Sequence, residues 1–233
     1  DNDSEYVCFL TDDNIVFDNV FLGDGFYELA EHDLFCAFSL RLGLNVNSRD
    51  VVKFGVDENV KTHDGPEAYM QLDIDGQYKP AAVGIAKFKE FLMWDRTIFP
   101  YGSYWSYSHS VDGHIFRKEH LRKWVNELIF LQKNDVFSIK TPNHFESKLQ
   151  RFWTDSRQMI VCFESSTVVN SPNNKVQEEV DNRSGDIHAL HQDDLLEMYN
   201  NGRRISFDKL YDSGAFENII CPHQEIDILK GLI

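Results

Sequence analysis

The chain has 233 residues, of which 42% are hydrophobic and 26% charged, and its formal net charge is −15. This composition excludes wholesale disorder, and the length is sufficient for one large domain or two small ones. No stretch approaches the roughly 18 uncharged apolar residues that a membrane-spanning helix requires, so we expect no membrane segment.

The charge is unevenly distributed along the chain. Residues 1–75 carry 17 acidic and 4 basic side chains, residues 76–175 carry 9 and 14, and residues 176–233 carry 12 and 5. The overall negative charge argues against non-specific nucleic-acid binding. Because the basic middle cannot neutralise both acidic ends, a negative surface should remain after folding. Such a surface favours a basic protein partner, although it is equally compatible with a role in solubility alone.

Hydrophobic patterning in the first 83 residues predicts short strands and one long helix. Residues 6–22 alternate short apolar runs with Asp-Asn pairs, which is typical of two strands and a turn. Residues 26–44 carry apolar side chains at near-helical spacing, so a helix is expected there. Residues 51–56 are a strand candidate, and residues 69–83 are typical of a hairpin that turns at Asp75-Gly76.

Helices dominate the expected structure of the remaining chain. Helical spacing of apolar residues predicts helices over residues 85–94, 118–131 and 145–153. Strand candidates lie at residues 136–140 and 159–163. The polar stretch 165–184 is expected to be a long loop, and the tail from residue 193 is expected to be mostly helical with a break at residues 200–202.

These elements together predict an α+β fold: a single compact domain of short strands and hairpins packed with four or more helices, with a helical C-terminal tail. The expected organisation is a main domain over residues 1–164 and a polar loop over residues 165–185. A mostly helical segment over residues 186–233 is expected to pack on the main domain.

The four cysteines form no C-x-x-C pair and match no zinc-binding spacing. Unpaired thiols favour a reducing, cytoplasmic compartment. The chain starts at Asp1 rather than Met, which suggests processing or a longer product. No pattern calls for a metal or another cofactor, and the oligomeric state is left open. Absence of a phosphate-binding loop, a G-x-S-x-G elbow and an H-E-x-x-H motif removes several common enzyme classes.

One enzymatic alternative is a papain-like or deubiquitinase-like cysteine hydrolase. Cys36 would be the nucleophile, and His188 or His191 would accept its proton. The pattern Asp33-x-x-Cys36-x-Phe38 resembles the nucleophile region of ovarian-tumour-type deubiquitinases, although Leu34 stands where that family has glycine. The competing interpretation is a core cysteine in the middle of the helix over residues 26–44, buried and without an imidazole partner.

A second enzymatic alternative is a metal-dependent nuclease built on Asp135, Glu146 and Lys148. Two carboxylates can hold Mg²⁺ while a lysine steadies the attacking water. The competing interpretation is a solvated helix face, because Glu146 and Lys148 fall within a helical pattern.

The function that we favour from the sequence is binding of another macromolecule, and the expected partner is a basic protein. Two contact surfaces are candidates, namely an acidic face and the aromatic stretch between residues 99 and 107, which could instead be part of the core. The acidic candidates are Asp12, Asp13, Asp57 and Glu58. The aromatic candidates are Tyr101, Tyr104, Trp105 and Tyr107.

Overall fold

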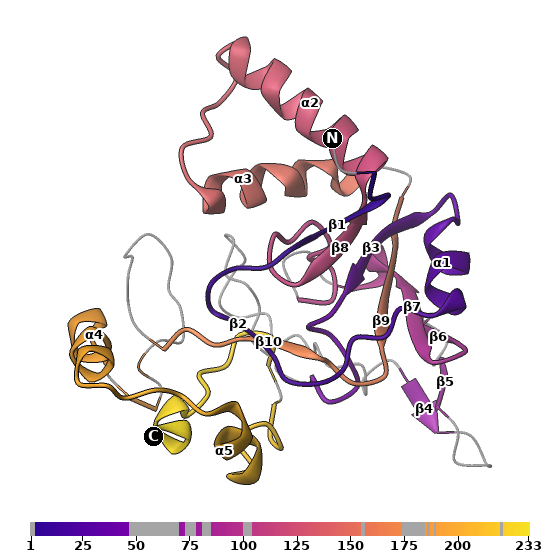
Figure 1. The fold of residues 1–233 in the computed structure, drawn as a ribbon. Helices are drawn as coiled ribbons and strands as arrows, with labels where there is room; N and C mark the ends of the chain where they lie inside the picture. Colours follow the sequence, from indigo (N-terminus) through magenta and orange to yellow (C-terminus); the bar gives the residue numbers. More distant parts are fainter. Residues whose placement is uncertain are drawn as a thin grey trace, which may run out of the picture.

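A six-stranded mixed sheet forms the centre of the computed structural model, with strand order β1-β8-β3-β9-β7-β6 (Figure 1). Its strands are β1 Tyr6–Phe9, β3 Phe35–Ser39, β6 Ile85–Phe88, β7 Phe91–Asp95, β8 His114–Arg117 and β9 Met159–Phe163. Strand β3 pairs in parallel with β9, and the other neighbouring pairs are antiparallel. The structure describes residues 3–46, 70–72, 78–80, 85–99, 104–154, 157–173, 185, 187–188, 190–219 and 221–233.

Two smaller antiparallel sheets join segments outside the central sheet. Strand β2 (Asn14–Val16) pairs with β10 (Val168–Asn170), and β4 (Met70–Leu72) pairs with β5 (Tyr78–Pro80). The second pair confirms the predicted hairpin strands. The turn of that hairpin and the strand predicted at residues 51–56 lie outside the described residues.

The helices complete an α+β fold with a largely helical C-terminal tail, as the sequence predicts. They are α1 Asp24–Ala30, α2 Lys118–Lys133, α3 Pro142–Leu149, α4 Gln192–Asn200 and α5 Phe207–Asp212. Short 3₁₀ helices are also present, at Arg96–Ile98, Gln150–Thr154 and Ile228–Gly231. Among the described residues, no helix combines the length and apolar character needed to cross a membrane.

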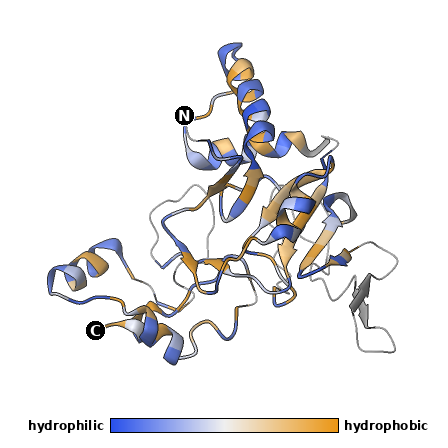
Figure 2. Ribbon diagram, turned by 45° about the vertical axis from the view of Figure 1, so that its right-hand side comes forward, coloured by the Kyte–Doolittle hydropathy of each residue, from blue (hydrophilic) through white to orange (hydrophobic). Residues whose placement is uncertain are grey.

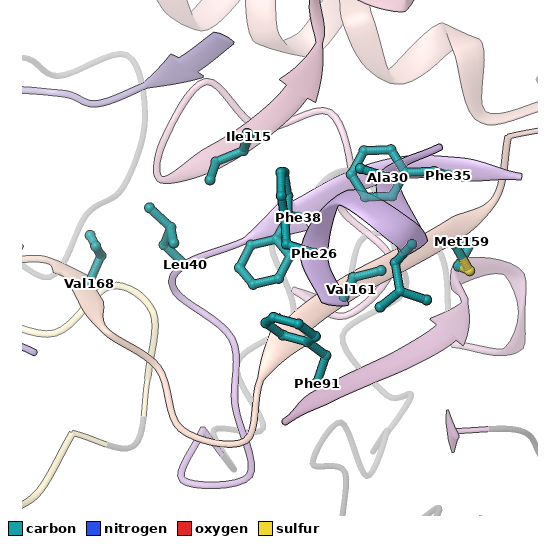
Figure 3. Packing of buried hydrophobic residues seen from close by; sticks show 11 residues of the cluster. Phe26, Ala30, Phe35, Phe38, Leu40, Phe91, Ile115, Met159, Val161 and Val168 are labelled. Carbon is teal, nitrogen blue, oxygen red and sulfur yellow. The ribbon is translucent and has the colours of Figure 1, made fainter. Parts of the chain in front are cut away.

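Helix α1 covers one face of the sheet with an aromatic core (Figure 3). Phe26 from α1 meets Phe38 of β3 edge-on, with ring centroids 5.4 Å apart, and Phe38 meets Phe91 of β7 in the same way at 5.5 Å. Edge-to-face contacts of this kind add to the hydrophobic stabilisation of burying the rings. The other residues in this cluster include Ala30, Phe35, Leu40, Ile115, Val161 and Val168.

Helices α2 and α3 contribute to a second buried cluster that also contains residues of β3 and β8. Leu121, Trp124 and Leu128 of α2 recur at helical spacing and are buried there, as predicted, while Val125 is half-buried. Helix α2 alternates hydrophobic and hydrophilic residues, as Figure 2 shows. The inner half of the helix is therefore held by the core, while its polar side faces solvent.

Two helix predictions are corrected by the sheet. Residues 26–44 begin as helix α1 but continue as strand β3, in which all five residues are buried. Residues 85–94 form the hairpin β6–β7, which turns at Lys89 with φ of 53°. A strand covered on both faces reads as a continuous apolar run, and such a run cannot be distinguished from a buried helix by spacing alone.

Smaller corrections concern the second half of the chain. Residues 136–140, predicted as a strand, connect α2 to α3 without regular secondary structure. Residues 165–184 were expected to be a loop, but they include β10. By contrast, β9 coincides with the strand predicted at residues 159–163, and α4 ends near the predicted break at residues 200–202.

The C-terminal segment is tied to the rest of the molecule beside β10. The backbone N–H of Asn170 donates to Pro222, and the N–H of Gln224 donates back to Asn170. Phe17, Val169, Ile219 and Ile226 form a small apolar cluster at this junction. Helix α4 lies farther out, well away from the central sheet and from α2 (Figures 1 and 2).

Candidate functional site

Cys36 lies on the central strand β3 with no exposed surface. Its burial agrees with the core interpretation, but the expected absence of an imidazole is wrong: Sγ of Cys36 is 3.8 Å from Nε2 of His109. His109 is equally buried and packs edge-on against Trp124 at 4.5 Å. The structure therefore contains a cysteine–histidine contact that the sequence analysis did not predict.

The hydrogen bonds of His109 determine what this contact can do. Nη1 of Arg96 lies 3.0 Å from Nδ1 of His109, and a guanidinium can only donate, so Nδ1 is the acceptor. The ring proton of the neutral imidazole is then on Nε2 and points toward the cysteine sulfur. A general base would need a lone pair at that position. Since both side chains are also fully buried, this pair is suited to packing rather than to hydrolysis.

The histidines proposed as partners of Cys36 make other contacts in the C-terminal segment. Nε2 of His188 lies 2.7 Å from Oδ1 of Asp227. His191 is the N-cap of α4 and forms a capping box with Asp194. The structure does not bring either ring to Cys36, whose imidazole neighbour is His109.

The proposed nuclease residues are likewise dispersed. Asp135 follows the end of α2 in a left-handed conformation, with φ of 56°. Glu146 of α3 accepts a hydrogen bond from Ser110 at 2.6 Å, and Lys148 lies over the ring of Phe137. Within the described ranges, no three His, Cys, Asp or Glu side chains converge as metal ligands would. The structure thus gives the nuclease alternative no geometric support.

A buried ion pair that sequence reasoning missed lies at the centre of a polar network. Nη1 of Arg41 is 2.6 Å from Oδ2 of Asp112 and 2.8 Å from Nε2 of His223. Nη2 donates to Ser110, which in turn donates to Glu146. These residues join the end of β3, the loop before β8, helix α3 and the C-terminal segment. The available signal was a charge, Arg41, inside the apolar run from Leu40 to Leu42.

The electrostatics of this network are those of a structural pair. Burial alone would raise the pKa of Asp112, but the positive charge of Arg41 holds that pKa below its usual value. Burial lowers the pKa of nearby His114 to about 3, so that ring is neutral. The adjoining cavity measures about 10 Å³, which is room for about one water molecule rather than for a substrate.

The aromatic stretch is directed mainly into the protein. Trp105 is buried, and its ring stacks on Phe99 and lies 4.8 Å from Trp94. Tyr104 is half-buried against His223, and Tyr107 is half-buried. Tyr101 lies outside the described residues. The described aromatic residues therefore contribute to the core more than to an adaptable contact loop.

The acidic candidates near the N-terminus differ in exposure. Asp12 is exposed, whereas Asp13 is half-buried. Burial and the nearby charges of Asp12 and Asp112 raise the pKa of Asp13 to about 6. Asp57 and Glu58 lie outside the described residues. The described part of this acidic face is therefore small, and one of its carboxylates is partly protonated below pH 7.

Asp13→Asn should stabilise the protein near neutral pH and have little effect near pH 4. The pKa of Asp13 is higher in the folded than in the unfolded state, so wild-type stability falls as pH rises from about 4 to about 6. Because the side chain is half-exposed, the gain should be about 1 kcal/mol. Urea unfolding at both pH values measures it, with exposed Asp18→Asn as control. A gain independent of pH would contradict the assignment.

Helix α4 exposes two large apolar side chains. It buries none of its residues, and Leu196 and Tyr199 remain 56% and 59% exposed. Tyr199 lies four residues after Leu195 and three after Leu196, so all three side chains share one face. Asp193, Asp194 and Glu197 lie on the other side, and α4 contains no basic residue.

Local interactions explain how α4 forms without burial. The His191 ring accepts from the backbone N–H of Asp193, and Oδ2 of Asp194 accepts from the N–H of His191. Acidic residues in the first turn also complement the helix dipole. A helix this short is nevertheless marginal in water without packing on its apolar face. Helix α4 is accordingly an acidic amphipathic helix presented to solvent.

Comparisons with protein-family models, with curated proteins and with solved structures each return no match to this chain. The candidate site therefore rests on the geometry of α4 and of the buried networks.

Proposed function

We propose that this protein binds another protein, and that α4 is the element that binds in a groove of the partner. The supporting observation is the apolar face of α4, on which Leu196 and Tyr199 stay more than half exposed although Arg204 lies over the Tyr199 ring. Exposed apolar side chains grouped on one face are typical of interaction sites. An amphipathic helix commonly binds by placing its apolar face in a hydrophobic groove, with anchor residues three and four positions apart.

The charge of α4 defines the chemistry of the partner. Asp193, Asp194 and Glu197 give the helix a formal charge of −3. The groove that receives it should therefore be apolar and bordered by lysine or arginine side chains. This proposal retains the basic partner expected from composition, but transfers the contact from Asp12, Asp13 and the aromatic stretch to α4. The cysteine-hydrolase alternative has less support, since the Cys36–His109 pair is buried.

Binding of a synthetic amphipathic peptide, with leucine on one face and lysine on the other, tests the proposal. Fluorescence anisotropy should show binding that weakens as salt is raised. Leu196→Ser with Tyr199→Ser should weaken binding by about tenfold or more, because apolar anchors carry most of the affinity. Phe21→Ser, which removes a 76% exposed ring elsewhere, is the matched control and should not alter binding. Equal affinity for all three proteins would refute the role of α4.

A further inference from the structure

The outer face of α2 has the opposite charge to α4. Arg122, Asn126, Ile129 and Lys133 follow one another at spacings of four, three and four residues, so they lie on one side of the helix. All four are exposed, and Phe130 beside them is 64% exposed. Lys123 adds a further cation at the edge of this surface. We call this surface the outer α2 face.

The cations of the outer α2 face are not within ion-pair distance of a described carboxylate, although Arg122 lines a surface hollow together with Glu5 and Glu31. Arg122, Lys123 and Lys133 form no ion pair within the described part of the chain, although Glu119 and Glu127 lie on the same helix. Helix α2 has four basic and two acidic side chains in total. Its apolar residues Ile129 and Phe130 are bordered by positive charge. This is the chemistry that α4 requires of its partner.

The outer α2 face and helix α4 cannot contact each other within one molecule. Helix α2 projects from the top of the structure in Figure 1, α4 lies at the lower left, and the two helices also lie far apart in Figure 2. The two views, turned by 45°, agree on this separation. Contact between the outer α2 face and α4 consequently requires two copies of the chain.

We propose that the chain associates with itself, α4 of one copy packing on the outer α2 face of another. This inference rests on the proposed function and specifies its partner as a second copy. Leu196 and Tyr199 would pack on Ile129 and Phe130, while Glu197 faces the cations of α2. Two copies related by a two-fold axis can make the contact twice and form a closed dimer. Where the rotation does not close, the same contact builds longer assemblies.

Charge exchange between the two helices tests self-association directly. One variant carries Glu197→Lys and Asn200→Lys on α4, leaving the His191–Asp194 capping box intact. The other carries Arg122→Glu and Lys133→Glu on α2. All four positions are exposed, so both variants should fold with wild-type circular dichroism. In each variant alone, α4 and the outer α2 face no longer have complementary charge.

Sedimentation and light scattering provide the readout. Wild type should exceed the monomer mass of 27.1 kDa as concentration rises, and high salt should reverse this. Each variant alone should weaken association by about tenfold or more, and an equimolar mixture should restore it, because opposite charges again meet. Leu196→Asp and Phe130→Asp should each prevent association even in the mixture. Restoration in the mixture is specific to contact between the two helices.

The outcomes separate this inference from the proposed function. Wild type that stays monomeric at all concentrations, yet binds the lysine–leucine peptide through α4, would overturn self-association and leave the proposed function intact. Self-association that is unaffected by either charge variant would also overturn it. Wild type that neither self-associates nor binds the lysine–leucine peptide would overturn the proposed function itself.

Discussion

Replacement of Trp124 by alanine is expected to destabilise the protein by about 3–5 kcal/mol, the cost typical of removing a buried aromatic ring. Trp124 is 3% exposed. Its ring stacks on Phe152 at 6.0 Å and meets His109 edge-on at 4.5 Å. Its removal would leave a cavity between α2 and the sheet that the neighbouring rings can fill only in part.

Chemical denaturation of wild type and Trp124→Ala measures this cost, and Phe130→Ala is the matched control. Phe130 is on the same helix but is 64% exposed, so its truncation should change stability by less than about 0.5 kcal/mol at dilute concentration. A cost below about 1 kcal/mol for Trp124→Ala would contradict the core position of the ring.

Elements with a long or clear hydrophobic pattern were predicted correctly, and elements with an ambiguous pattern were not. Helix α2 and strand β9 were predicted because one is long and periodic and the other is a short apolar run with a polar flank. Strand β3 and the hairpin β6–β7 were read as helices. In both segments apolar side chains occur on two faces, and neighbouring strands, which no local pattern reveals, decide between the two structures.

The candidate site was harder to predict because it depends on distant contacts. Burial of Cys36 follows from the apolar run around it, but its contact with His109 depends on how the chain folds 73 residues later. The pairing of Arg41 with Asp112 has the same origin. Helix α4 shows a different limit: a helix was expected in this part of the tail, but the sequence does not reveal that Leu196 and Tyr199 remain exposed.

Asp112→Asn is expected to destabilise the protein by about 3–5 kcal/mol, because it removes the carboxylate that pairs directly with a buried arginine. Arg41 is 3% exposed, and its Nη1 lies 2.6 Å from Oδ2 of Asp112. Asparagine keeps the shape of the side chain, so the loss reports charge rather than packing. Adjacent Gly113 has a positive φ of 67°, and a Cβ added there would lie 2.7 Å from the Arg41 stem, so the arginine packs directly against the glycine.

A double-mutant cycle separates the charge effect from the rest. Arg41→Gln combined with Asp112→Asn removes both charges. The double variant should therefore lose less unfolding free energy than the sum of the losses in the two single variants. The pKa of Asp112 is lowered in the folded protein, so this carboxylate stabilises the fold above about pH 4, and that contribution is lost as pH falls. The difference between wild type and Asp112→Asn should therefore be constant from about pH 5 to 8 and shrink in stronger acid. Additive costs in the cycle, with a difference that does not change below about pH 4, would show that the pair does not hold the network together.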